Sequence, residues 1–330
     1  MSFLFPSTTI TFEAALRDLT QGSPKARVFA ANALGEVTEP TEKRRALEAL
    51  ITALDDDRPE VRAEACGSLG ELGEPGALSP LIKRLSDGVA GVRQNAAIAL
   101  GTLGHADGFA PLVEALATGP ADLRFQAATS LAEIDGARAY DPLVAALDDK
   151  DSQVVAAAAL ALGGIADPRA SAVLATKLDH SDPGTRFDVA YALAQLREPA
   201  GRDVLVAALG DLERAWDAVT ALGTLGHASD AEALARALVS KHTPPEATVL
   251  AAGTLLRLDA PAHHDAARRV LLAALSARKT HVRGLAVEQL GAAGGEWAIA
   301  PLEKLAKSRK GSDLIDAIGA AIRAIGERAG

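Results

Sequence analysis

The chain is poor in aromatic residues, in cysteine and in long uncharged apolar runs, and each shortage removes a class of protein. Only 3% of its 330 residues are aromatic although 48% are hydrophobic, a balance that suits close-packed helices of alanine and leucine better than a β-sandwich. Cys66 is its single cysteine, so it forms no intrachain disulfide, and we expect a reducing, cytoplasmic location. No stretch of about 20 apolar residues is free of charge, so we expect no membrane span.

Positive charge is also scarce. The chain has 34 lysines and arginines against 43 aspartates and glutamates, which gives a net charge of −9. Nucleic acids and anionic membranes are bound by positively charged surfaces. We therefore expect no nucleic-acid partner, whereas a basic protein partner fits this charge.

What the chain does contain is an internal repeat. An arginine is followed by alanine three positions later and by Leu-Gly seven and eight positions later, as in Arg62, Ala65 and Leu69-Gly70. Ten copies carry an apolar anchor at the leucine position. The anchors are Leu34, Leu69, Leu100, Leu131, Leu162, Leu193, Leu222, Leu255, Leu290 and Ile325. Four consecutive spacings are 31 residues, which is the signature of a repeat architecture.

Each repeat is expected to form a hairpin of two helices. The first helix carries a Pro-Leu pair such as Pro111-Leu112, and proline is placed in a first turn or kinks the helix. A turn rich in Asp, Ser, Gly and Pro then caps the second helix. The second helix is expected to end at its repeat glycine, in a left-handed conformation. Because neither helix buries its apolar face alone, neighbouring hairpins must stack, which predicts an all-α solenoid.

This repeat resembles the short HEAT-like repeat of phycobilisome bilin lyases and of many bacterial scaffold proteins. The resemblance extends over residues 12–328. It implies one α-α superhelix of about ten HEAT-like hairpins. Anchor spacings of 29 and 33 residues and the absence of the repeat arginine predict an irregular stretch around residues 211–259. Residues 1–11, which contain Phe3 and Phe5, are expected to form an extension or cap. The resemblance also implies that the second helices line an inner, concave surface. Because this fold hosts adaptors, lyase subunits, a hydroxylase and DNA glycosylases, it leaves the function open.

The repeat arginine is predicted to be structural. Counted from it, positions −1, +3, +4 and +7 form the buried side of the second helix, and Cys66 at +4 is expected to be a small buried residue. The arginine points toward the same side and therefore needs a partner of opposite charge. Turn aspartates such as Asp57, Asp87 and Asp182 are the candidates. The arginines of this structural ladder are Arg27, Arg62, Arg93, Arg124, Arg186 and Arg283.

Positions +1, +2, +5 and +9 lie on the opposite side of the second helix. Eight acidic and two basic residues occupy them, so the inner surface is predicted to be acidic. Its middle is apolar, with Ile98, Phe125, Leu160, Phe187, Tyr191 and Trp216 at +1 or +5. Aromatic residues exposed in a groove usually mark a partner site, and Asp188 and Asp217 beside them would favour a basic or amphipathic protein. The alternative is that these side chains are buried between neighbouring repeats.

The predicted function is a non-catalytic scaffold or adaptor. A bilin lyase-like subunit is an alternative that rests on the repeat type. A HEAT-like DNA glycosylase, with Trp216 and Asp217 as its residues, is a further one that the acidic surface opposes. His263-His264-Asp265 is the only local histidine cluster, and neighbouring residues on a helix make a poor chelate. We therefore predict no catalytic residue, no metal site and no cofactor.

Overall fold

The structure, a computed structural model, describes residues 10–258 and 260–329. These residues form twenty α-helices and seven short 3-10 helices without any strand, which confirms the prediction of an all-α solenoid of about ten helical hairpins. No helix among them is long and apolar enough to span a membrane. The helices group into two compact units, Met1–Ala170 and Ser171–Gly330. The single domain expected over residues 12–328 stays a prediction, and Phe3 and Phe5 of the expected extension lie outside the described residues.

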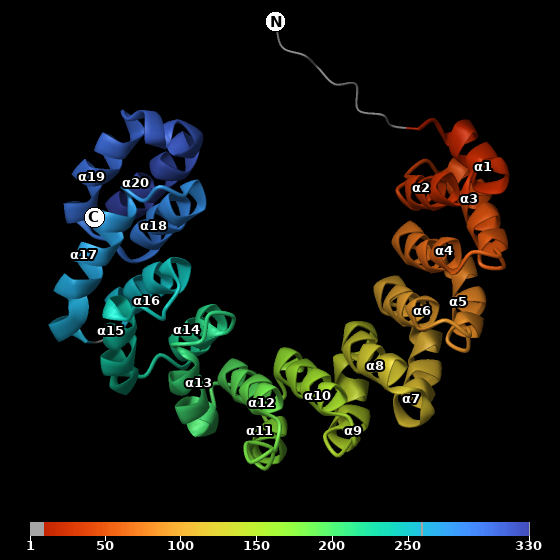
Figure 1. The fold of residues 1–330 in the computed structure, drawn as a ribbon, viewed down its shortest axis with the longest axis horizontal. Helices are drawn as coiled ribbons and strands as arrows, with labels where there is room; N and C mark the ends of the chain where they lie inside the picture. The colour runs from red at the N-terminus through yellow and green to blue at the C-terminus, as the bar shows by residue number, and fades with distance from the viewer. Residues whose placement is uncertain (1–9, 259, 330) are drawn as a thin grey trace, which may run out of the picture. The chain divides into compact units, whose positions relative to one another are not determined.

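Unit 1 is a stack of five hairpins (Figure 1). Its first helices are α1 (Phe12–Gln21), α3 (Pro40–Ala53), α5 (Leu78–Arg84), α7 (Phe109–Thr118) and α9 (Gly136–Ala146). Its second helices are α2 (Pro24–Gly35), α4 (Pro59–Leu72), α6 (Ala90–Leu103), α8 (Ala121–Ile134) and α10 (Ser152–Ile165). Successive second helices pack on one another more extensively than successive first helices do. This tighter layer makes the outward side of the second helices, called here the second-helix face, the concave side of unit 1.

Unit 2 repeats the same hairpin. Its first helices are α11 (Ala170–Ala175), which starts at the last residue of unit 1, α13 (Arg202–Ala208), α15 (Ala231–Val239), α17 (His264–Ala274) and α19 (Ile299–Ala306). Its second helices are α12 (Pro183–Gln195), α14 (Ala215–Leu225), α16 (Pro245–Arg257), α18 (Thr280–Ala293) and α20 (Ile315–Ala329). In the stretch predicted to be irregular, α14 has 11 residues whereas α18 has 14.

The 3-10 helices stand directly before first helices, apart from the last one, which precedes α20. They are η1 (Pro75–Ala77), η2 (Ala106–Gly108), η3 (Pro199–Gly201), η4 (Ala228–Asp230), η5 (Pro261–His263), η6 (Glu296–Ala298) and η7 (Arg309–Leu314). The prolines of the Pro-Leu pairs follow the expected rule at three places: Pro80, Pro111 and Pro301 are the third residues of α5, α7 and α19. Pro142 lies inside α9, which begins earlier because no 3-10 turn precedes it.

The ten anchor residues form the spine of the core. Every one of them lies on a second helix and is at most 1% exposed. Cys66 is completely buried, as its position in the repeat predicts. Burial raises the pKa of its thiol to about 12, because the thiolate would lose its hydration. Cys66 is therefore a small core residue and not a nucleophile.

The repeat glycine has a different role from the predicted one. Only α2 ends at this glycine, Gly35, whereas α4 and α6 continue past Gly70 and Gly101. The left-handed residues come three positions later, at Gly73 and Gly104. The repeat glycine instead allows the next second helix to approach closely. A Cβ atom on Gly35, Gly70 or Gly101 would lie 2.9, 2.8 or 3.2 Å from the Cα atom of Ser68, Ala99 or Ser130.

Replacing Gly70 with alanine is therefore expected to destabilise unit 1. The new methyl group would meet the backbone of α6, and overpacking of this kind costs about 1–3 kcal/mol. Gly164, near the end of α10, is the matched control because a Cβ there meets nothing within 4 Å. Gly164→Ala should leave stability unchanged or raise it by up to about 1 kcal/mol, since alanine is the better helix former. Urea unfolding of both variants measures the difference, and equal midpoints would refute the close-contact role.

Candidate protein-binding surface

The repeat arginines of unit 1 join each hairpin to the next one. Arg62 donates from Nε and Nη2 to the two carboxylate oxygens of Asp87, both at 3.0 Å. Arg124 binds Asp149 in the same two-pronged way, with both bonds at 2.7 Å. Hydrogen bonds from the guanidinium lower the pKa of each carboxyl group, since they favour its charged form. All four side chains are at most 16% exposed, so these closed pairs offer nothing to a ligand.

Arg27 and Arg93 make single-pronged versions of this contact. Nη2 of Arg27 lies 3.1 Å from Asp56 and 2.8 Å from Asp57. Nη2 of Arg93 lies 2.9 Å from Asp122, in the first turn of α8. In all four cases the carboxylate belongs to the following hairpin, so the arginine ladder of unit 1 runs between hairpins.

The ladder changes its chemistry in unit 2. Arg186 donates to the carbonyl oxygens of His180 and Ser181 at 2.7 and 3.1 Å. Asp182, expected as a partner of a ladder arginine, caps α12 by accepting bonds from the backbone nitrogen and the hydroxyl of Thr185. The expected ion pair is thus replaced by bonds to the loop backbone.

Arg283 behaves in the same way as Arg186. It donates to the carbonyl oxygens of Ala277 and Lys310 at 2.9 and 3.2 Å. Its side chain is buried with these oxygens as partners. In both places the arginine holds a loop in position, and it does so without a carboxylate.

Apolar side chains gather on the second-helix face of unit 1. Four of them are exposed by 36–52%, a high value for large apolar residues. They are Phe29, Ile98, Phe125 and Leu160 on α2, α6, α8 and α10. Acidic residues lie on the same face, namely Glu36, Glu64, Glu71 and Glu133. This face therefore combines exposed apolar contacts with negative charge, which are the two properties of a docking surface for a basic amphipathic segment.

A hollow of about 700 Å³ lies between α8 and α10. Leu160 and Ile165 give it an apolar wall, and Glu133 and Asp167 add carboxylates. Asp167 is already paired with Arg169 at 2.6 Å, whereas Glu133 is exposed. The hollow is large enough to hold a few side chains of a partner. It therefore enlarges the surface that Glu133 and Leu160 offer for binding.

Unit 2 carries a smaller surface of the same kind. Trp216 is 41% exposed on α14, Asp217 beside it is exposed, and Tyr191 on α12 is half-buried. Phe187 does not join them, since it is only 5% exposed. The guanidinium of Arg214 lies over its ring, 5.4 Å from the centroid. The prediction that Phe187 is an exposed contact residue is therefore wrong for this structure, because Arg214 and the core of unit 2 cover it.

Asp188 is an acidic residue in an unfavourable place. Burial raises the pKa of its carboxyl group, and the charges of Asp182 and Asp217 raise it further against the lowering effect of Arg214. At neutral pH its negative charge therefore costs stability, and this cost disappears as the pH falls through the raised pKa. An added cation near Asp188 and Asp217 would relieve the same cost.

The histidines are dispersed. His263 lies 3.7 Å from Glu232, His264 faces the carbonyl oxygen of Leu258 at 3.3 Å, and the neighbouring Asp265 lies near Arg268 at 3.6 Å. The sequence cluster His263-His264-Asp265 thus splits toward different partners. Within residues 10–258 and 260–329, no group of three or more His, Cys, Asp or Glu side chains is placed to hold a metal ion.

Two features of the surface escape the sequence argument. Phe29 is at position +2 of its repeat, one of the four outward offsets, whereas the predicted apolar residues are all at +1 or +5. The second feature is a difference in charge along the chain. Residues 261–330 contain eleven basic and seven acidic residues, whereas residues 1–260 contain 23 and 36. Counting charges by repeat would have revealed it.

Comparisons with known proteins agree with this architecture. The family model described as HEAT repeats matches residues 13–98, 80–163 and 151–217. Among proteins with curated descriptions, none matches the chain in sequence.

Similar solved structures include three proteins. Importin beta is 12% identical, with a TM-score of 0.57, over 95% of this chain and 52% of that one. The AP-3 complex, a homology model, is 16% identical, with a TM-score of 0.57, over 85% and 56%. The complex of CpcE and CpcF of phycocyanin lyase from Nostoc sp. PCC7120 is 26% identical, with a TM-score of 0.40, over 82% and 97%. At such low sequence identity the likeness to importin beta and the AP-3 complex concerns the fold alone.

Proposed function

The chain belongs to the HEAT repeat family, and we propose from this premise that it is a non-catalytic scaffold that binds a basic or amphipathic protein segment on its second-helix faces. A repeat solenoid of this kind presents an extended surface suited to protein binding. The observation that carries the proposal is the set of four exposed apolar side chains on one acidic face of unit 1.

The electrostatics of unit 2 support the same class of partner. Asp188 and Asp217 lie near each other on the second-helix side, and the pKa of Asp188 is raised by burial and by this repulsion. A lysine or arginine of a partner would stabilise both carboxylates. Residues that cost stability in the free protein are often those that function requires.

The catalytic alternatives gain no support from the residues. A glycosylase would place Trp216 and Asp217 beside a phosphate backbone, yet Asp188 and Asp182 add negative charge there and would repel phosphate. The bilin lyase alternative rests on the repeat type, and no particular residue of this chain supports it.

The first test uses the full chain and a fluorescent amphipathic peptide with leucine on one helical face and lysine on the other. Phe125→Ala combined with Leu160→Ala should weaken its binding by about 2 kcal/mol if these side chains are the anchors. Glu133→Lys should mainly slow association, because charges at the edge of an interface steer the encounter. Titration by fluorescence anisotropy measures both effects.

Val89→Ala is the matched control. Val89 is 41% exposed, but it lies in the turn before α6 and is not one of the four exposed apolar residues of the second-helix face. The substitution should leave the affinity unchanged. A peptide with glutamate in place of lysine should bind the double variant as well as it binds the wild type, because the second-helix faces repel it. Equal loss of affinity in Val89→Ala and in the double variant, or unchanged affinity in both, would contradict the proposed site.

A further inference from the structure

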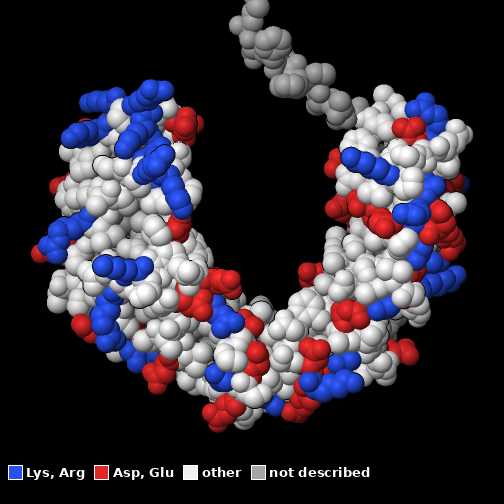
Figure 2. All heavy atoms as spheres, in the orientation of Figure 1, with Lys and Arg blue, Asp and Glu red and all other residues white. Residues whose placement is uncertain are grey.

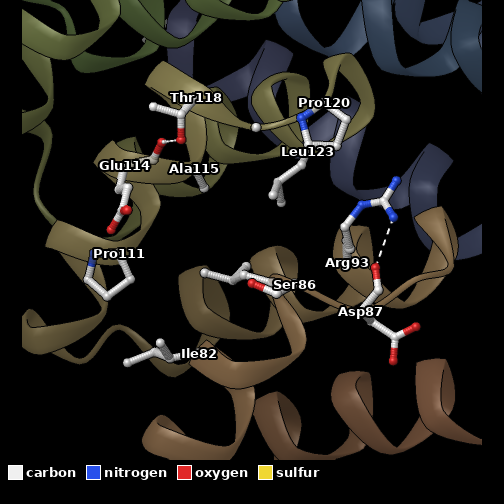
Figure 3. Close-up of a pocket in the computed structure, with 12 residues that line it drawn as sticks. Ile82, Ser86, Asp87, Arg93, Pro111, Glu114, Ala115, Thr118, Pro120 and Leu123 are labelled. Carbon is white, nitrogen blue, oxygen red and sulfur yellow. Dashed lines mark hydrogen bonds between the residues drawn. The ribbon is translucent and has the colours of Figure 1, made fainter.

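The layer of first helices contains a second kind of groove, which recurs in three repeats. It lies between successive first helices: α5 and α7 with about 540 Å³ (Figure 3), α7 and α9 with about 410 Å³, and α17 and α19 with about 570 Å³. Equivalent positions line all three grooves. In the order α5–α7, α7–α9 and α17–α19, the earlier helix and its end contribute Ile82, Val113 and Leu272 at one position and Leu85, Leu116 and Leu275 at another. The later helix contributes Pro111, Pro142 and Pro301. The grooves exist because first helices pack less closely than second helices.

The edges of these grooves differ in charge. The residue three positions after the groove proline lies at the groove edge. In the α5–α7 groove this residue is Glu114, close to Pro111 in Figure 3. In the α17–α19 groove the equivalent residue is Lys304, and Lys310 also lines the groove. Nζ of Lys310 donates to the carbonyl oxygen of Ser276 at 3.0 Å, which keeps this ammonium group at the groove.

More cations surround the α17–α19 groove. Arg278, Lys307 and Arg309 are exposed next to it in the chain, and Figure 2 shows lysine and arginine side chains gathered over the C-terminal helices. Within the described part of the chain, neither these three residues nor Lys304 forms an ion pair. The helix dipole favours Lys304, in the last turn of α19, and Lys307, its C-cap. This reason does not extend to Arg278 and Arg309. A cluster of cations without counter-charges attracts an acidic partner.

We propose that the α17–α19 groove binds an acidic peptide segment of a partner protein. An apolar side chain of the peptide lies over Leu272, Leu275 and Leu305, and its carboxylates lie beside Lys304 and Lys310. The apolar floor favours a peptide over a nucleic acid, whose phosphates would find contacts only at the edge. This site is independent of the second-helix faces, so the scaffold has two docking surfaces of opposite charge.

The test measures binding of a fluorescent peptide of leucine and glutamate to the full chain by anisotropy. We expect saturable binding that weakens as salt is added. Lys304→Glu should reduce the affinity by about tenfold or more, because it reverses a charge at the contact. Ala300→Trp fills the groove without changing its charge, since Ala300 is an exposed lining residue, and it should reduce the affinity as strongly.

Lys241→Glu is the control for charge alone, because Lys241 is an exposed residue of unit 2 outside the groove. It should change the affinity by less than about twofold at physiological salt, where distant charges are screened. Thermal melting of each variant verifies that it folds. The proposal is overturned if the peptide does not bind, if Ala300→Trp binds it as well as wild type, or if duplex DNA or anionic vesicles bind more tightly and depend on Lys304. None of these outcomes affects the second-helix faces, which are tested with the basic peptide.

Discussion

Phe187→Ala should lower the free energy of unfolding by about 3–5 kcal/mol, the usual cost of deleting a buried phenylalanine ring. The side chain is 5% exposed, belongs to the core of unit 2 and lies beneath Arg214. Its removal would leave a cavity and would also deprive the guanidinium of Arg214 of its aromatic contact. Chemical unfolding followed by circular dichroism measures the loss.

Phe125→Ala is the matched variant, because Phe125 occupies the same position of its repeat and is 36% exposed. It should cost at most about half as much stability, since its ring is already partly in water. It should instead weaken binding of the basic amphipathic peptide. If Phe187→Ala unfolded like wild type and lost the peptide, the ring would be a contact residue in solution and its assignment to the core would fail.

Arg124→Ala should destabilise unit 1 by about 2–4 kcal/mol, because it leaves the carboxylate of Asp149 buried without its cation. The Arg124 and Asp149 side chains are 8% and 12% exposed. Arg44→Ala is the control, since Arg44 and its partner Glu48 are 85% and 67% exposed. Breaking such a surface pair costs at most about 0.5 kcal/mol.

The same variant has a predictable pH dependence. Arg124 lowers the pKa of Asp149 in the folded protein, so the pair contributes its full stability above the unfolded pKa of about 3.9. That contribution is lost as the pH falls further, through the lowered folded pKa. The difference between wild type and Arg124→Ala should therefore be constant from neutral pH to about pH 5 and shrink below about pH 4. A difference that persists at low pH would mean that Arg124 acts through packing.

The repeat itself could be predicted from the sequence because it depends on periodic burial. Ten leucine or isoleucine anchors at near-constant spacing require ten equivalent buried positions, and the structure has them. The arginine at position zero similarly implied a nearby carboxylate, and Asp87 and Asp57 fulfil this role. Local chemistry that is repeated many times is visible in a single sequence.

Features that depend on the contact between particular neighbours could not be predicted. Phe125 and Phe187 share a position in the repeat, yet only Phe187 is covered, because Arg214 comes from the following hairpin. Likewise the sequence around Gly70 predicts a helix end. The structure shows instead that Gly70 allows the backbone at Ala99 to approach closely. Such contacts join residues about one repeat apart, and the spacing pattern does not tell which of them touch.

The close contact at the repeat glycine restricts which repeats can follow one another. Gly35, Gly70 and Gly101 each face a serine or alanine of the next second helix, so each junction depends on a pair of residues contributed by two repeats. Duplicating or deleting one 31-residue unit conserves the pairing as long as both sides keep their small residues. A bulky residue at either place of these three junctions would clash with the neighbouring helix, whereas the junction of α16 and α18 has Leu256 and Gln289 at the equivalent places and does not use this contact. At these three junctions two residues thus act as a compatibility rule, through which this part of the array can lengthen, shorten or exchange repeats during evolution without redesign of its core.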